Sequence, residues 1–449
     1  MTPIYLDHNA TTPILPEAWE AMRPVMAEAF GNPSSAHQMG RRARQFLEDA
    51  REKMAGLLGA DSDEVVFTSG ATEANNLAIL GLHLGVDSPH ILASRIEHPC
   101  VIEPLRQLAN QGVAVEWLPV SERGIVETEA VVAQVTPNTR LICLMLVNHE
   151  TGAIQPVRHV AKKFHKELFI HCDAAQAVGK IPVNFHDLSV TTLSASAHKF
   201  RGPKGVGVLL LKRGTKCQPR FFGGHQQKGF RPGTEPVALA VGMATALEVA
   251  VRDMAGNLAK LEALRTRFIT KLREAIPNIV LNSPEATDPT PASPRNGEGS
   301  SGRSSSLPVC GEGRGGVEPA TRGVDIPATG GSDRPPLIPP HAGGEKTALP
   351  QGARGWGCSL PTTVNLSFLG CRSDVLLVSL DLAGIACSTG SACSSGSLLP
   401  SPVLEAMGVS EERLRSAIRF SLSAMLTAQD IDEAVQRIEK CVLMVRNAR

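Results

Sequence analysis

The sequence predicts an α/β protein with a large, mostly parallel sheet, followed by a smaller α+β region. Short apolar runs typical of buried strands recur through the first half of the chain. Segments with apolar residues at three- and four-residue steps, typical of amphipathic helices, separate several of these runs. Alternation of this kind favours a parallel sheet that helices cover on both faces.

The first elements are well defined by their spacing. Apolar residues recur at helical steps over 34–59, and the pattern then changes to that of a short strand over 64–68. Ser69 and Gly70 form a predicted turn, and a second helix is expected over 71–84. Further strands are expected at 90–93, 114–118, 141–146, 168–172, 191–195 and 207–211.

The last part of the chain has the pattern of a small α+β domain. We expect a strand over 363–368, a helix over 373–383 and a strand over 415–422. A final helix follows, and Thr427 and Asp430 provide its capping pattern. We therefore predict two domains: a large domain over 1–260, whose N-terminal segment contributes to the small one, and a small domain over 261–449.

Residues 284–357 do not fit this pattern. They include 12 prolines and 15 glycines among 74 residues, a share that is typical of low-complexity sequence. Such a composition cannot bury enough apolar surface to form a core. We expect a disordered insertion that interrupts the small domain.

Composition excludes several classes of function. A net charge of +1, with 42% hydrophobic and 20% charged residues, is typical of a soluble globular protein and offers no basic face for nucleic acid. The chain shows neither a secretory signal nor an apolar run of the ~18 residues that a membrane helix needs. Ten cysteines without a Cys-x-x-Cys pair indicate reduced thiols, and no zinc-type cluster is evident. We expect a cytoplasmic protein that needs no membrane, nucleic acid or metal.

Two residues carry the main chemical hypothesis. Cys393 lies among small residues, which suits a thiol that must move, and Lys199 follows a short apolar run, which suits a buried amine. A lysine can capture a carbonyl as a Schiff base, and a thiolate can attack sulfur. The pair suggests sulfur abstraction on pyridoxal phosphate. For Lys199, an exposed loop position is the alternative.

Four further positions could serve such a site, and each has a simpler interpretation. The turn that ends at Thr72 could cradle a phosphate at a helix N-terminus, or it could be an ordinary capped turn. Asp173, at the end of a strand, could pair with a pyridine nitrogen or cap a helix. His98 could stack on a ring and move protons, or lie at the surface. Arg419 could bind a carboxylate, or face water from an edge strand.

Taken in order along the chain, nine segments resemble the cysteine desulfurases of the class-V aminotransferase family. The match covers nearly the whole chain except 284–357. The segments that carry it are 5–12, 31–37, 68–76, 97–98, 148–150, 171–176, 196–199, 231–234 and 391–395.

This resemblance implies a dimeric, fold-type I enzyme that depends on pyridoxal phosphate. It implies that Lys199 holds the cofactor as a Schiff base, that Asp173 pairs with the pyridine nitrogen and that His98 stacks on the ring. The other implied contacts are Ala71, Thr72, Ser196 and His198 on the phosphate, Thr234 from the partner subunit, Gln176 at the ring hydroxyl, Asn148 beside the ring, and Arg419 with Asn32 on the substrate carboxylate.

The implied reaction converts L-cysteine to L-alanine and leaves a persulfide on Cys393, which an acceptor protein then receives. The style of the cysteine loop resembles the group that supplies iron–sulfur scaffolds and tRNA thiolation. His149 stands where asparagine is common in the family, and we expect this change to be tolerated. Two alternatives stay open: a lyase for selenocysteine or another β-substituted amino acid, and a decayed paralogue that acts only as a binding module.

Overall fold

The computed structural model describes residues 2–285, 358–390 and 400–447. Residues 1–291 and 355–449 cluster as one compact unit, to which the description below applies. Two predictions concern residues outside the described ranges: the insertion, from residue 286 onward, and Cys393.

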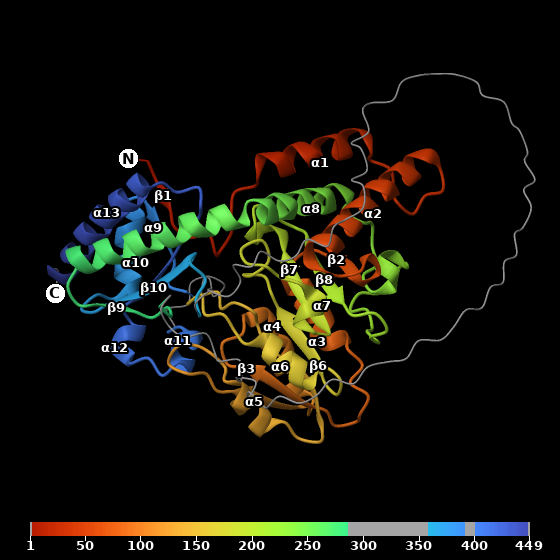
Figure 1. The fold of residues 1–449 in the computed structure, drawn as a ribbon, viewed down its shortest axis with the longest axis horizontal. Coiled ribbons are helices and arrows are strands. Elements are labelled where there is room, and N and C mark those ends of the chain that lie inside the picture. The colour runs from red at the N-terminus through yellow and green to blue at the C-terminus, as the bar shows by residue number, and fades with distance from the viewer. Residues whose placement is uncertain (1, 286–357, 391–399, 448–449) are drawn as a thin grey trace, which may run out of the picture. The chain divides into compact units, whose positions relative to one another are not determined.

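A seven-stranded sheet forms the larger part of the fold (Figure 1). All neighbouring strands are parallel except where the strand Gly207–Leu211 (β8) lies antiparallel to both of its neighbours. The prediction of a large, mostly parallel sheet is confirmed. In spatial order the strands are β2 (Val65–Thr68), β8, β7 (Thr192–Ser196), β6 (Phe169–Asp173), β5 (Thr139–Cys143), β3 (His90–Ser94) and β4 (Ala114–Leu118).

Both faces of this sheet are buried except along the edge strand β4, as the continuous apolar strands predict. On β3, Leu92 belongs to one apolar cluster, and its neighbours Ile91 and Ala93 belong to another on the opposite face. The first cluster includes residues of α2 (Gln38–Leu58), α6 (Val157–Phe164) and α8 (Val237–Arg252). The opposite face is covered by α3 (Ala71–Gly81) and α4 (Pro99–Asn110).

The strand predicted over 141–146 differs from the observed β5. The paired strand ends at Cys143, but the chain stays against the sheet, because Leu144 N–H donates to His171 O and Leu146 N–H donates to Asp173 O. The apolar run therefore marks how far burial extends rather than where regular pairing stops.

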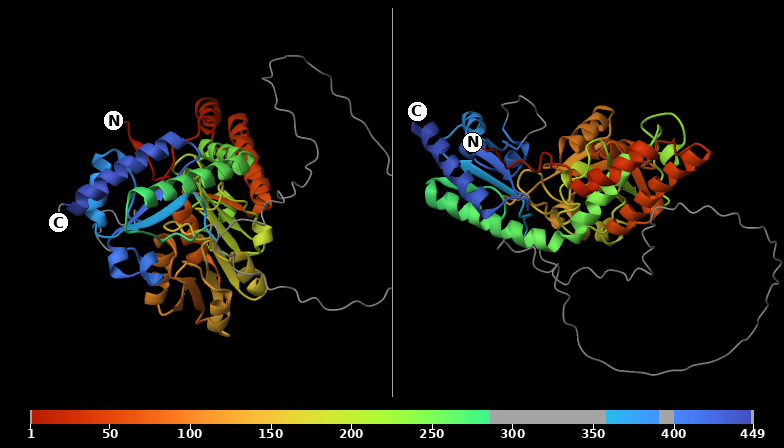
Figure 2. Two further views of the ribbon diagram at one scale, coloured as in Figure 1. Left: turned by 60° about the vertical axis from the view of Figure 1, so that its left-hand side comes forward. Right: turned by 90° about the horizontal axis from the view of Figure 1, so that it is seen from above.

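A second apolar cluster forms the core of the C-terminal part of the chain. The strands β12 (Ala417–Ser421), β10 (Thr363–Phe368) and β9 (Ile279–Leu281) form an antiparallel sheet in that order. It packs with α9 (Met254–Ala275), α10 (Ser373–Leu382) and α13 (Ala428–Asn447). Figure 2 shows α8 and α9, in green, following one another from the large sheet toward these strands.

The ends of the chain also meet in this second cluster. Near the N-terminus, β1 (Ile4–Tyr5) pairs in parallel with β11 (Ile385–Ala386). The predicted cap of α13 is confirmed, since Asp430 N–H donates to Thr427 Oγ1 at 3.1 Å and Thr427 N–H donates to Asp430 Oδ2 at 2.7 Å. The division at residues 260 and 261 stays a prediction. No helix within the described ranges is both long and apolar enough to cross a membrane.

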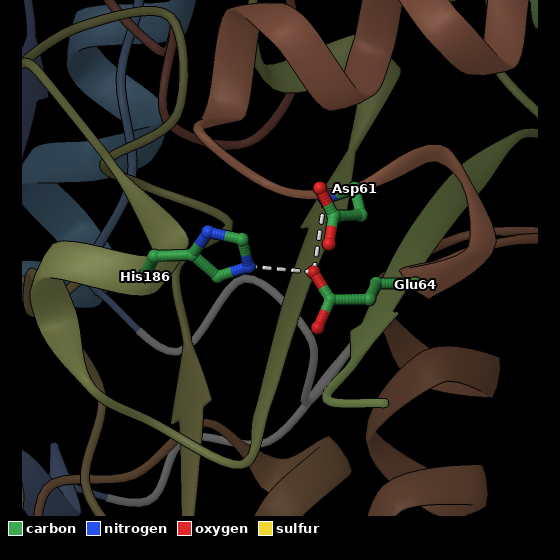
Figure 3. A group of neighbouring side chains, drawn as sticks. All are labelled: Asp61, Glu64 and His186. Atoms are coloured by element: carbon green, nitrogen blue, oxygen red, sulfur yellow. Dashed lines mark hydrogen bonds and ion pairs between the residues drawn. The ribbon is translucent and has the colours of Figure 1, made fainter. Parts of the chain in front are cut away.

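Asp61, Glu64 and His186 form a compact polar junction at one edge of the large sheet (Figure 3). His186 Nε2 lies 2.7 Å from Glu64 Oε2, and the same oxygen accepts from Asp61 N–H at 2.9 Å. Arg213 contacts both carboxylates, with Nη2 donating to Asp61 Oδ2 at 3.0 Å and N–H donating to Glu64 Oε1 at 3.1 Å. Because protein donors already engage these carboxylates, we interpret the junction as a structural link and assign it no metal.

Candidate active site

A cavity of about 350 Å³ lies at the carboxyl ends of β6 and β7, beside the N-terminus of α3. Ligands of open α/β sheets characteristically bind at such an edge. The cavity brings together most of the residues that the sequence singled out. Those that line it are Ala71, Thr72, His98, Asp173, Gln176, Ser196, His198 and Lys199.

Lys199 lies at the end of a short 3-10 helix, Ala197–Lys199, that follows β7 directly. Its Nζ donates to the carbonyl oxygens of Asn9 at 2.6 Å and Ala10 at 3.0 Å. The N-terminal segment thus holds the amine at the cavity wall. Burial lowers the pKa of the neighbouring His198 to about 4, so this ring is neutral at pH 7.

Asp173 ends β6 and is 5% exposed. Its Oδ1 accepts from Ala175 N–H, and its Oδ2 accepts from the Asn75 amide, each at 2.9 Å. The bond to Ala175 is one that a helix cap would make, but turns rather than a helix follow Asp173. The capping interpretation therefore does not account for this carboxylate at the cavity wall.

His98 precedes the first residue of α4 and caps that helix. Cys100 N–H donates to His98 Nδ1 at 3.2 Å, which leaves the proton of a neutral ring on Nε2. The His149 ring lies edge-on to it, with ring centroids 5.2 Å apart. Burial is the main cause that lowers the pKa of both histidines. His149, the departure from the family pattern, thus lines the cavity as a neutral partner of His98.

Four predicted residues within the described ranges do not line this cavity, and three of them are Asn148, Asn32 and Thr234. Asn148 is fully buried, and its side chain accepts from the backbone of Glu150 and Thr151 while it donates to Ile96 O. It therefore fixes the turn that carries His149. Asn32 and Thr234 are exposed.

Arg419 is also absent from the cavity lining, but it lies nearby and is 2% exposed. It binds Asp7 at 2.8 Å and donates to the carbonyl oxygens of His149 at 3.2 Å and Gly390 at 3.3 Å. The water-facing alternative for this arginine is wrong. Its Nε has no hydrogen-bond partner among the described residues.

Glu150 lies close to the chain on both sides of the undescribed segment 391–399, at Gly390 and at Ser401. Ser401 Oγ donates to Glu150 Oε2 at 2.5 Å, and a side chain at Gly390 would collide with the same carboxylate. Burial raises the pKa of Glu150 to about 6. Gly390 and Ser401 therefore both lie beside the turn that carries His149.

Sequence reasoning missed several residues of this cavity. Cys100, which was assigned no role from the sequence, lines the wall, and its Sγ lies 2.9 Å from His98 Nδ1. Its place two residues after His98, in the first turn of a helix, was the available signal. Met145 and Val147 contribute apolar wall, and the apolar strand pattern gave no sign that they face a cavity.

Glu97 precedes His98 and is buried, so the pH dependence of stability can test whether its carboxyl is neutral in the folded protein. Burial raises the pKa of this carboxyl from 4.5 to about 8, so the folded protein holds a proton that the unfolded chain releases. The free energy of unfolding should therefore fall as the pH rises from 4.5 to 8, and above pH 8 the total loss reaches up to about 5 kcal/mol. Glu97→Gln mimics the neutral carboxyl. Denaturant unfolding at pH 5, 7 and 9 should show that the free energy of unfolding of the variant increases relative to that of the wild type as the pH rises.

Glu52→Gln, on an exposed position of α2, is the matched control and should show no such trend. A difference between Glu97→Gln and wild type that stays constant from pH 5 to 9 would contradict the expected proton uptake.

The chain is similar to proteins named cysteine desulfurase. Residues 4–293 match the family described as Aminotransferase class-V. A Dictyoglomus turgidum protein named cysteine desulfurase IscS is 36% identical over 446 residues, covering 99% of this chain and 95% of that protein. A Dictyostelium discoideum protein named probable cysteine desulfurase, mitochondrial, is 35% identical over 99% of this chain and 84% of its own length.

A solved structure of a protein titled NIFS-like protein has the same fold. Its TM-score is 0.77 at 30% identity, and the match covers 99% of this chain and 100% of the other. As a family, these enzymes depend on pyridoxal phosphate. The chain therefore belongs to the class-V aminotransferase family, within its cysteine desulfurase group of enzymes.

Proposed function

We propose that this chain uses pyridoxal phosphate to remove sulfur from L-cysteine, forming L-alanine and a persulfide on Cys393. An acceptor protein, either an iron–sulfur scaffold or a tRNA-thiolation protein, then receives the sulfur. The observation that carries the proposal is that Lys199, Asp173 and His98 line one cavity with the N-terminus of α3.

The donor set of the cavity fits this cofactor. The N-terminal turn of α3, with Ala71 and Thr72, and the side chains of Ser196 and His198 suit a phosphate. The buried carboxylate of Asp173 suits a protonated pyridine nitrogen, and Gln176 suits a ring hydroxyl. When bound, the cofactor supplies an electron sink for the bonds around the substrate α-carbon.

The side chains around the cavity have distinct tasks in this proposal. The Lys199 amine removes the α-proton of the substrate and returns a proton later. His98 stacks on the ring and can donate from Nε2, since its Nδ1 accepts from Cys100 N–H. Arg419 offers its buried Nε to the substrate carboxylate.

The sulfur transfer needs no outside oxidant. The Cys393 thiolate attacks the substrate sulfur, an S–S bond forms and the bond between that sulfur and Cβ breaks. The electron pair of the broken bond stays with the carbon skeleton, which takes up protons and becomes alanine. The carbon is reduced by the two electrons that the sulfurs lose.

A homodimer is also part of the proposal, with Thr234 reaching the phosphate of the partner subunit. Exposed apolar residues support an interface between subunits, because large apolar side chains are seldom this exposed on a free surface. On α1 (Pro16–Glu28) and just after it, Trp19, Met26 and Phe30 are 52%, 60% and 74% exposed, and Phe222 is 91% exposed. A cytoplasmic location and the identity of the acceptor stay predictions.

Product analysis tests the proposed reaction. With L-cysteine and a reducing thiol, the enzyme should release one alanine for each sulfide, because the carbon skeleton keeps its amino group. A β-lyase would instead release pyruvate and ammonia with the sulfide, and that outcome would overturn the proposal. Parallel reactions with L-selenocysteine separate a sulfur enzyme from a selenium enzyme.

A further inference from the structure

A line of buried side chains ends on the Asp173 carboxylate. Asp173 Oδ2 accepts from Asn75 Nδ2 at 2.9 Å, and Asn75 Oδ1 lies 3.0 Å from His171 Nε2. His171 Nδ1 lies 2.9 Å from Thr192 Oγ1. Asn75, His171 and Thr192 are all fully buried, and they come from α3, β6 and β7 respectively.

The direction of each hydrogen bond in this line follows from chemistry. A carboxylate only accepts, so Asn75 must present its amide N–H to Asp173 and its oxygen to His171. The oxygen needs a donor, which places the His171 proton on Nε2. Burial lowers the pKa of His171 to about 4, so the ring is neutral and Nδ1 accepts from the Thr192 hydroxyl. Every donor in the line therefore points toward Asp173.

Both N–H groups of the Asn75 amide have hydrogen-bond partners. Its Nδ2 also lies 2.9 Å from Cys100 Sγ, so both of its hydrogens have partners. Asp173 Oδ1 is fixed separately, by Ala175 N–H at 2.9 Å and by Ser194 Oγ at 3.5 Å. Asp173 Oδ2 has one further contact, Cys100 Sγ at 3.9 Å, and a thiol is a weak donor, so Asn75 is the strong donor that orients this second carboxylate oxygen.

We propose that Asn75, held in one orientation by His171 and Thr192, is a positioning residue that fixes the Asp173 carboxylate toward the pyridine nitrogen of the cofactor. This inference rests on the proposed cofactor site. Asn75 acts through Asp173, and it is absent from the cavity lining. Without its amide, the Oδ2 oxygen of Asp173 and the N–H of His171 would be buried with fewer partners, which is costly inside a protein.

Titration of the full-length, cofactor-free protein with pyridoxal phosphate tests the inference. A hydrogen bond to a charged group contributes about 1.5–3 kcal/mol, so Asn75→Ala should weaken binding about 10- to 100-fold. The visible absorption band of the bound cofactor, and the pH at which it changes, should also shift, because both depend on the proton at the ring nitrogen. A residue with only a structural role would leave that band unchanged.

Variants of His171 separate orientation from packing. His171→Gln keeps an N–H donor for Asn75 and should bind pyridoxal phosphate much more tightly than His171→Phe, which has none. Asn76→Ala is the matched control: it removes the same group one residue along α3, where the side chain donates to Thr72 O at 2.9 Å. This control should keep the wild-type absorption band.

The outcomes are distinguishable. If wild type binds the cofactor, and Asn75→Ala binds it equally well with an unchanged band, the inference is wrong and the proposed function stands. If wild type takes up no pyridoxal phosphate, the proposed function fails and the inference fails with it. Should Asn75→Ala not fold, Thr192→Val applies the same test, because it removes only the hydroxyl that orients His171.

Discussion

Lys199→Ala is expected to lose covalent attachment of pyridoxal phosphate and to lower kcat/KM for L-cysteine by about 10³-fold, because one amine serves as both anchor and proton carrier. Borohydride reduction of the wild-type enzyme should fix one cofactor to the peptide that contains Lys199. The variant should show none by peptide mass analysis. Lys204→Ala, at an exposed position in the same loop, is the control and should behave as wild type.

The main alternative for this role is a second partly buried lysine, Lys180. Lys180 Nζ donates to Gln176 Oε1 at 2.6 Å and to Asn9 Oδ1 at 3.3 Å, so both lysines contact Asn9. Burial lowers the pKa of Lys180 to about 7, which leaves part of it neutral and able to react. Lys180 does not line the cavity that Asp173 and His98 share. Cofactor fixed on Lys180 in the wild-type enzyme would contradict the assignment to Lys199.

The sequence was most informative where one residue's environment follows from its position in a strand or turn. Asp173 ends a parallel strand and Thr72 lies in the first turn of a helix, so local pattern made both of them candidates for one edge of the sheet, whereas Ser196 came only from the family resemblance. Lys199 follows β7 by three residues and reaches the same edge.

Residues that act through distant partners could not be found in this way. Helical spacing predicts that Asn75 lies within α3, but its partners His171 and Asp173 are 96 and 98 residues away. The burial of Arg419 likewise depends on Asp7, which is 412 residues away. Alternation along one strand cannot reveal that a far segment covers its outer face, so a water-facing arginine was the natural local interpretation.

Cys393→Ser is expected to abolish the persulfide and lower turnover of L-cysteine by at least about 10³-fold, because a hydroxyl oxygen cannot take up the transferred sulfur. Mass analysis after incubation with L-cysteine should find the added sulfur on Cys393 in the wild-type enzyme and nowhere in the variant. Exchange of the substrate α-proton with deuterated water should persist, because the Lys199 amine is intact. Lys199→Ala should lose both reactions, so the two variants separate proton removal from sulfur transfer.

Cys387→Ser is the matched control, since it removes a thiol six residues earlier in the same stretch of chain. Burial raises the pKa of the Cys387 thiol well above its ordinary value, so this thiol stays protonated at neutral pH and is a poor nucleophile. The control should therefore keep wild-type persulfide formation. Added sulfur on Cys387, or undiminished alanine production by Cys393→Ser, would show that the chain uses another route. In that case Cys393 would take no part in the reaction. The proposed transfer step would then be wrong, even if pyridoxal phosphate were bound at Lys199.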